Sequence, residues 1–257
     1  MKSNTEELRK RGYIDDFDIS EYRPKSKEEL IELLQDKEAY VRSAAAKMLS
    51  FKFDMNDAEL FKIILDKIIQ EKKLYVRIEM AAALAKGGEL TAKEMIKFIG
   101  KIGNNQHKVL PERPSKKKNF PLARDFMTRS LGRMNTCVMP VMLEVLESED
   151  KEKISEIFDS IGYMAFYNLQ VAKSEYADII LKTLEKYKDE EVIYWKGIQC
   201  LSGFPWIKTV QFLKSVIEEN REQLFVEEAK RSLRLMKKPL LDQSVLDSKN
   251  KIERENT

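Results

Sequence analysis

Cationic side chains in one short segment offer the clearest chemistry in the sequence. The segment GNNQHKVLPERPSKKKN, residues 103–119 and called here the basic loop, sets five cations against a single acid, Glu112. These cations are Lys108, Arg113, Lys116, Lys117 and Lys118. Lysine and arginine bind carboxylates and phosphates, so the loop predicts a site for an acidic partner. The alternative is a solvated, poorly ordered insertion that has no partner.

Three arginines extend the basic chemistry beyond the loop, because each lies in a similar sequence context: Arg42, Arg77 and Arg124. A row of arginines on successive helices would bind anions, whereas acids nearby would pair with them inside the protein. Asp36 and Glu71 stand six residues before the first two arginines, so we expect both to be structural. Lys118 takes that place before Arg124, so we expect Arg124 to be free to bind an anion.

Residues for catalysis or metal binding are few. The single histidine, His107, has no second histidine or cysteine at metal-ligand spacing, and the cysteines Cys137 and Cys200 are far apart. The sequence contains no nucleophile elbow, P-loop or dinucleotide-binding motif. We therefore predict no catalytic residues, no metal and no cofactor.

An aromatic group surrounds the stretch CLSGFPW, residues 200–206. Its members are Tyr194, Trp195, Phe204 and Trp206. Such rings could stack on a base or hold a partner. Gly203 and Pro205 mark a turn between helices here, and this favours packing in the core.

The elements that position these residues follow a helical period. In YVRSAAAKML, apolar or small residues recur at helical spacing from Val41 to Leu49, and LYVRIEMAAAL repeats the pattern from Val76 to Leu84. An amphipathic segment precedes each phrase, so the repeating unit is a helix, a tight turn and a second helix. Arg42 and Arg77 are 35 residues apart, a period typical of helical solenoids.

The same register extends along the chain if Arg124, Ile154, Tyr194 and Val226 take the place of Arg42. The pattern R-x-x-A-x-x-A-L-G resembles HEAT and HEAT-like (PBS-lyase type) repeats over roughly residues 26–236. The resemblance implies an all-α, right-handed α-solenoid of about six antiparallel helix pairs, an armadillo-like superhelix. The later repeats depart from the family pattern at the arginine position, and an irregular helical bundle is the alternative.

The expected organisation has three parts. Residues 1–25 form an N-terminal capping segment, residues 26–236 form the repeat array with the basic loop inserted, and residues 237–257 form a C-terminal tail. The expected helix pairs lie at 26–51, 57–86, 91–134, 137–167, 174–204 and 205–236. Few glycines and prolines, nine and seven, are consistent with long helices.

Composition favours a folded protein without a general affinity for polyanions. The chain of 257 residues is 43% hydrophobic, and 46 basic residues nearly balance 43 acidic ones. The charged N-terminus and the lack of a long apolar run predict neither a secretory signal nor a membrane span. We expect a cytoplasmic protein.

These observations predict a non-enzymatic adaptor or scaffold that binds a protein or peptide partner on the curved face of the array. The partner would be acidic if the basic loop takes part, through the loop cations and Arg124. The alternative is a nucleic-acid-binding protein similar to HEAT-like alkylpurine DNA glycosylases, which use an aspartate beside tryptophans in a basic groove. Asp189 near Trp195 would be the counterpart under that resemblance.

Overall fold

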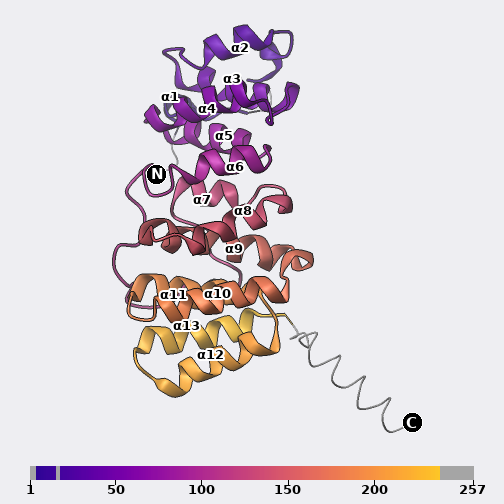
Figure 1. Cartoon of the computed structure of the whole chain (residues 1–257). Coiled ribbons are helices and arrows are strands. Elements are labelled where there is room, and N and C mark those ends of the chain that lie inside the picture. The colour runs from indigo at the N-terminus through magenta and orange to yellow at the C-terminus, as the bar shows by residue number, and fades with distance from the viewer. Residues whose placement is uncertain (1–3, 16–17, 238–257) are drawn as a thin grey trace, which may run out of the picture. The chain divides into compact units, whose positions relative to one another are not determined.

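The computed structural model describes residues 4–15 and 18–237, and these residues form an all-α protein. They contain thirteen α-helices and five short 3₁₀ helices, with no β-strand among them (Figure 1). The all-α prediction is thus confirmed. None of the described helices is long and apolar enough to cross a membrane. The predicted C-terminal tail lies almost entirely outside the described residues.

The chain divides into two compact units, Met1–Ile102 and Gly103–Thr257. The boundary coincides with the start of the basic loop, so the predicted pair at 91–134 contributes one helix to each unit. Unit 1 contains α1 (Thr5–Lys10), η1 (Ser20–Tyr22), α2 (Lys27–Leu33), α3 (Ala39–Lys52), α4 (Ala58–Gln70), α5 (Leu74–Leu84) and α6 (Glu89–Ile96).

Unit 1 is built from helix pairs whose second members pack together. Helix α2 contacts α3, α4 contacts α5, and the second helices α3 and α5 contact each other. Ser43 Oγ donates a 2.6 Å hydrogen bond to the carbonyl of Gly12 and ties the N-terminal segment to α3. The predicted capping segment is therefore part of unit 1.

Arg42 and Arg77 form hydrogen bonds inside unit 1, as the sequence predicts, although their partners differ from those expected. Arg42 donates to both carboxylate oxygens of Glu71, at 2.7 and 3.0 Å, and to the main-chain carbonyl of Asp36 instead of its carboxylate. Arg77 donates to the main-chain carbonyl of Glu71. In each case the main-chain acceptor lies six residues before the arginine.

Unit 2 contains the basic loop and the remaining helices. These are α7 (Phe126–Leu131), η2 (Thr136–Val138), α8 (Met139–Glu144), η3 (Val145–Glu147), α9 (Lys151–Tyr167), η4 (Leu169–Val171), α10 (Ser174–Lys186), α11 (Glu191–Cys200), η5 (Leu201–Gly203), α12 (Ile207–Glu219) and α13 (Gln223–Leu235). Helix α8 packs on α9, α10 on α11 and α12 on α13. The second helices form the row α7, α9, α11, α13, in which each contacts the next (Figure 1).

Polar side chains fix several helix starts. Ser26 and Glu29 form a reciprocal capping box at α2. Asp57, Asp125 and Asp150 accept main-chain N–H bonds at the first turns of α4, α7 and α9. Because these caps lie at the tight turns, the pairs begin close to where the sequence predicts.

The predicted register is wrong at one position. Arg42, Arg77, Ile154, Tyr194 and Val226 are each the fourth residue of their helix, as one common register requires. In α7 the fourth residue is Arg129, whereas Arg124 precedes the helix. Arg129 donates to the main-chain carbonyl of Ala123, six residues earlier, and so repeats the bond made by Arg42 and Arg77. The length of the basic loop hid this shift.

Candidate ligand-binding surfaces around the basic loop

A row of buried polar side chains crosses the second helices of unit 2 beneath the basic loop. On α9, α11 and α13 the positions two and five residues after the register position carry polar or charged groups. We call this set the polar ladder: Glu156, Asp159, Lys196, Gln199, Glu228 and Arg231. All six are buried, which is uncommon for charged residues unless they are paired.

The centre of the polar ladder is an ion cluster on α9 and α11. Lys196 Nζ lies 2.6 Å from Glu156 Oε1 and 3.0 Å from Asp159 Oδ2. Burial raises the pKa of Glu156 to about 7 and also raises the pKa of Asp159, against the opposing effect of the Lys196 cation. Two carboxylates thus face the single ammonium group of Lys196, and Asp159 also accepts a 3.4 Å bond from the side-chain amide of Gln199.

The far end of the polar ladder holds the basic loop. Arg231 donates 2.8 Å bonds to Glu228 Oε1 and to the carbonyl of Asn119, and a 3.3 Å bond to the carbonyl of Lys117. The other oxygen of Glu228 accepts a 3.1 Å bond from the indole of Trp195. This chain of bonds joins α11, α13 and the end of the loop.

Aromatic contacts hold the loop at two more points. Phe120, just after the loop, is 2% exposed and packs on Phe166 and Tyr163 of α9. The His107 ring lies edge-on to Trp195, with centroids 4.9 Å apart. These contacts anchor the basic loop through backbone carbonyls and rings that its composition does not reveal.

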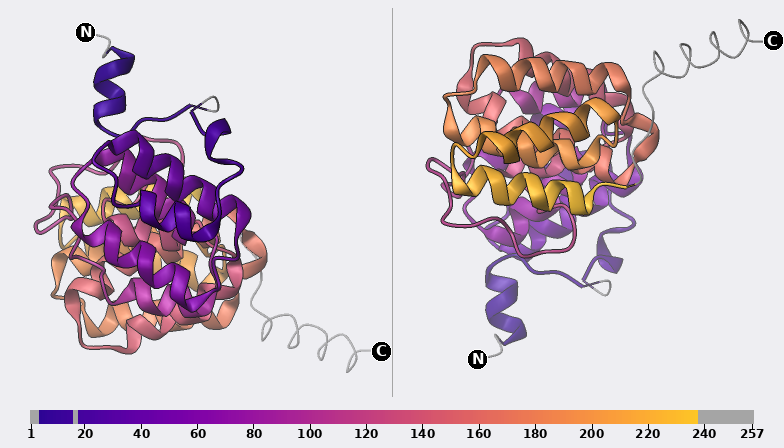
Figure 2. Two further views of the ribbon diagram at one scale, coloured as in Figure 1. Left: turned by 90° about the horizontal axis from the view of Figure 1, so that it is seen from above. Right: turned by 90° about the horizontal axis from the view of Figure 1, so that it is seen from below.

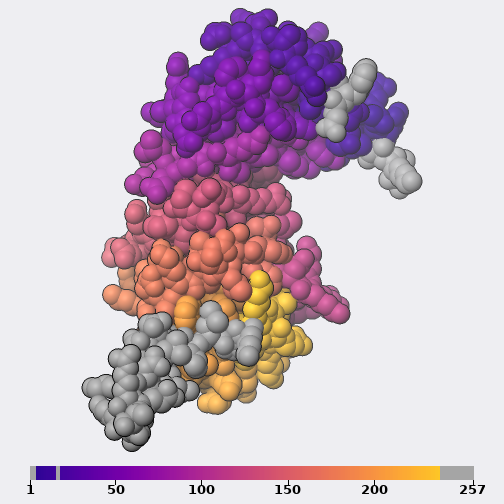
Figure 3. Space-filling model, turned by 90° about the vertical axis from the view of Figure 1, so that its right-hand side faces the viewer, coloured from indigo at the N-terminus to yellow at the C-terminus, as the bar shows by residue number. Residues whose placement is uncertain are grey.

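The cations of the loop and of α13 line one groove. The hollow has a volume of about 360 Å³ and is lined by Arg113, Pro114, Ser115, Lys116, Glu227, Lys230, Arg231 and Arg234. We call it the basic groove. The loop lies beside α13 (Figures 2 and 3), where Arg231 donates to the carbonyl of Asn119. Arg113, Lys116, Lys230 and Arg234 are exposed, and within the described part of the chain none forms an ion pair with a carboxylate.

A smaller hollow of about 290 Å³ is lined by the basic loop, by the residues that follow it and by α9 and α11. Its lining includes Arg113, Lys117 and Arg124, together with Asp159 and Gln199 of the polar ladder. Arg124 is exposed there, so its charge faces solvent. Three of the predicted binding residues, Arg113, Lys117 and Arg124, thus meet at one surface.

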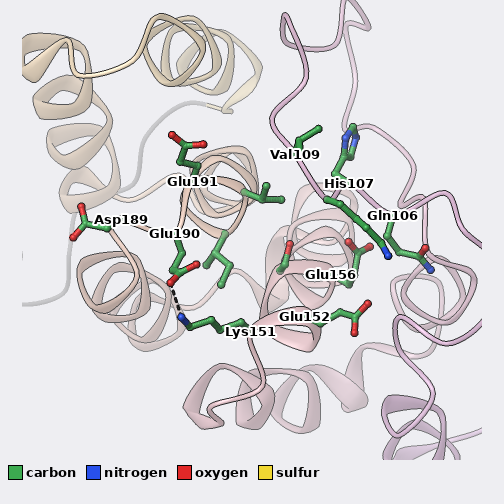
Figure 4. Close-up of a pocket in the computed structure, with 13 residues that line it drawn as sticks. Gln106, His107, Val109, Lys151, Glu152, Glu156, Asp189, Glu190 and Glu191 are labelled. Carbon is green, nitrogen blue, oxygen red and sulfur yellow. Dashed lines mark hydrogen bonds and ion pairs between the residues drawn. The ribbon is translucent and has the colours of Figure 1, made fainter.

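The largest of the three hollows is acidic and lies where residues 106–109 pass α9 and α11. It has a volume of about 660 Å³. Its lining is Gln106, His107, Lys108, Val109, Lys151, Glu152, Ser155, Glu156, Asp189, Glu190, Glu191, Val192 and Ile193. We call it the acidic hollow (Figure 4). Of the predicted binding residues only Lys108 lies here, and Lys118 lines none of the three hollows.

The aromatic group packs inside the fold. Tyr194, Trp195 and Phe204 are at most 5% exposed. The indole of Trp206 donates a 2.7 Å bond to the carbonyl of Ala172, so both tryptophans use their N–H groups internally. The prediction of core packing at this turn is confirmed.

Comparisons with known proteins leave the family open. No protein-family model and no curated protein matches the chain. Two engineered proteins solved by the Northeast Structural Genomics Consortium are similar in structure at 14% sequence identity. One covers 84% of this chain and 99% of its own with a TM-score of 0.40, and the other covers 83% and 99% with a TM-score of 0.35. These likenesses are too weak to inform function.

Proposed function

We propose that this chain is a non-enzymatic adaptor built from HEAT-like repeats, and that its basic groove binds an acidic segment of a protein partner. The observation that carries the proposal is the contrast between two sets of cations. Lys196 and Arg231 are buried and paired with carboxylates of the polar ladder. Arg113, Lys116, Lys230 and Arg234 line an open groove with only one acid, Glu227.

The groove has the features that an extended acidic peptide would require. Its cations come from two separate segments, the basic loop and α13, so a peptide lying between them would meet positive charge on both sides. The loop is already held by Arg231 and Phe120, so ordering it on binding costs little.

The same proposal includes a cytoplasmic location. The two cysteines, Cys137 and Cys200, form no disulfide, which is consistent with a reducing setting.

Nucleic acid is the rival partner, since phosphates would also bind these cations. Base-stacking proteins present aromatic rings to their ligand, whereas Trp195 is buried and donates to Glu228. Asp189, the counterpart suggested by the resemblance to the glycosylases, faces solvent and pairs with Arg221. These contacts favour the protein partner.

The class of partner is tested by fluorescence anisotropy with two probes across a salt series. One probe is a short labelled peptide of alternating glutamate and serine, and the other is a labelled DNA duplex of similar total charge. We expect the peptide to bind at least as tightly as the duplex at every salt concentration. Tighter binding of the duplex with a steep salt dependence would contradict the proposal and favour the nucleic-acid reading.

A further inference from the structure

Two buried acceptors in the first turns of α9 have no hydrogen-bond partner within the described residues. They are Ser155 Oγ and Glu156 Oε2. Ser155 is 7% exposed and Glu156 is 1% exposed. A buried polar atom without a partner destabilises a fold by about 1–3 kcal/mol, so two neighbouring instances call for an explanation.

Both residues line the acidic hollow, and the charges around them are mainly negative. Glu190 is paired with Lys151 and Asp189 with Arg221, which leaves Glu152 and Glu191 exposed at the rim without an ion pair in the described structure. In Figure 4 the Glu156 carboxylate lies between Glu152 and His107, on the opposite side of the hollow from Glu191. The hollow therefore presents hydrogen-bond acceptors at its base and carboxylates at its mouth.

We infer that the acidic hollow binds an organic cation, a guanidinium or alkylammonium group, whose N–H groups donate to Glu156 Oε2 and Ser155 Oγ. Glu152 and Glu191 then hold the charge of the ligand at the mouth. Binding would place a second cation beside the cluster of Glu156, Asp159 and Lys196, in which one ammonium group faces two carboxylates. This site is separate from the basic groove, and the inference does not depend on the proposed function.

Other ligand classes fit the lining less well. An anion would face three carboxylates, Glu152, Glu156 and Glu191, against Lys108 as the unpaired cation of the lining. An apolar ligand would leave Ser155 Oγ and Glu156 Oε2 buried without partners. Among the described residues, no group of three or more histidine, cysteine or carboxylate side chains is placed to hold a metal ion. A cation with N–H groups would both donate to the unpartnered oxygens of Ser155 and Glu156 and balance the carboxylates of the lining.

The chain has a built-in reporter for this site. His107 is the single histidine of the sequence and lines the hollow, so its ring proton signals in NMR need no assignment. We would titrate the protein with N-acetylarginine amide, which carries one guanidinium group and no other charge. N-acetylcitrulline amide, the uncharged analogue of almost identical shape, is the control. A saturable shift with the arginine probe and none with the citrulline probe is the expected result.

Four variants locate the binding. Glu156→Gln should weaken the arginine probe about tenfold or more, as expected for loss of a buried charged hydrogen bond. Glu152→Gln, an exposed change at the rim, should weaken it about two- to fivefold. Ser155→Ala should weaken the probe while leaving resistance to urea unchanged or higher, because its hydroxyl has no partner in the unbound protein. Glu185→Gln, an exposed change on α10 outside the hollow, should have no effect.

The source of the cation is distinguished by two further probes, a pentapeptide with a central arginine between glycines and free spermidine. Tighter binding of the peptide assigns the hollow to a side chain of a protein partner, and tighter binding of spermidine assigns it to a free polyamine. Equal binding of the arginine and citrulline probes, no shift with any cation, or full affinity in both Glu152→Gln and Ser155→Ala would overturn the inference. These readouts use no acidic probe, so they remain interpretable if the basic groove fails its own test.

Discussion

Lys196 Nζ lies 2.6 Å from Glu156 Oε1 in a region where neither side chain is more than 2% exposed. The same ammonium group also serves Asp159, so a single lysine on α11 compensates two acids on α9. Buried ion clusters of this kind contribute little net stability when complete, but they are costly when one member is lost. Lys196 therefore decides whether α9 and α11 can stay packed at this point.

Removing the shared cation should destabilise unit 2 strongly. We predict that Lys196→Met reduces the free energy of unfolding by about 3–5 kcal/mol, because two carboxylates remain buried without a counter-charge. Urea denaturation followed by circular dichroism measures the change. Lys182→Met on α10, an exposed lysine, is the control and should stay within about 0.5 kcal/mol of the parent. If Lys196→Met lowered the free energy of unfolding by less than about 1 kcal/mol, Lys196 would not be the buried counter-charge of Glu156 and Asp159.

The single histidine should titrate far below its usual range. Burial lowers the pKa of His107 from 6.5 to about 4, with the Arg124 and Lys196 cations acting in the same direction. An NMR titration of its ring protons should therefore give a midpoint near 4. A midpoint between 6 and 7, the range of an unperturbed histidine at about 6.5, would mean that residues 106–109 do not rest against α11.

The same shift links His107 to stability. The pKa of His107 is lower in the folded protein than in the unfolded chain, so the unfolded chain binds the proton more tightly. The free energy of unfolding that depends on the neutral ring is therefore fully present above about pH 6.5 and is lost as the pH falls toward 4. Burial raises the pKa of Glu156 from 4.5 to about 7. The carboxyl group of Glu156 therefore makes the free energy of unfolding larger as the pH falls from about 7 to 4.5, which is opposite to the effect of His107. The two effects oppose each other in the bulk stability curve, so the NMR midpoint is the clearer measurement.

A glycine on α9 lets the chain after the basic loop pack closely. A Cβ atom at Gly162 would lie 2.5 Å from Phe120 Cζ and 2.8 Å from the Cα atom of Cys200. Replacing glycine by alanine within a helix normally stabilises it by about 1 kcal/mol, but the main chain of α11 cannot move aside here. We predict that Gly162→Ala lowers the free energy of unfolding by about 1–3 kcal/mol, an overpacking effect.

The matched control for this prediction is Gly197→Ala on α11. The three nearest atoms to a Cβ there all belong to the side chain of Leu184, so no main-chain atom is among them. Gly197→Ala should therefore cost less than Gly162→Ala in the same urea experiment. The opposite order would mean that α9 and α11 do not approach each other as closely as described.

The sequence predicts the helices well because their signals are local. The apolar period and the capping side chains Ser26, Asp57 and Asp150 lie within the segments that they organise, so pair boundaries can be read without tertiary information. The register fails at α7, where the basic loop separates Arg129 from the preceding repeat. The bond from Arg129 to the carbonyl of Ala123, which only the structure shows, identifies Arg129 as the counterpart of Arg42 and Arg77.

The candidate sites were harder to predict because their partners are distant in sequence. Glu156 and Lys196 are 40 residues apart, and Arg231 binds carbonyls more than 110 residues away. The sequence does contain one signal for the polar ladder. Polar residues recur two and five positions after Ile154, Tyr194 and Val226, the register positions of α9, α11 and α13. Charged residues repeated on a helix face that should be buried indicate a polar ladder, and this pattern could be sought in other repeat proteins.

The most direct test of the account compares binding of the labelled acidic peptide to two double variants by fluorescence anisotropy. Lys116→Ser with Lys230→Ser removes one cation from each wall of the basic groove, whereas Lys182→Ser with Lys214→Ser removes the same charge from exposed positions on α10 and α12. All four lysines are exposed, so neither double variant should change the melting temperature appreciably. We predict that the groove variant weakens peptide binding about three- to thirtyfold at low salt, from two exposed charge contacts, while the control binds like the parent. Equal affinity of the two variants would contradict the claim that the basic groove is the binding site.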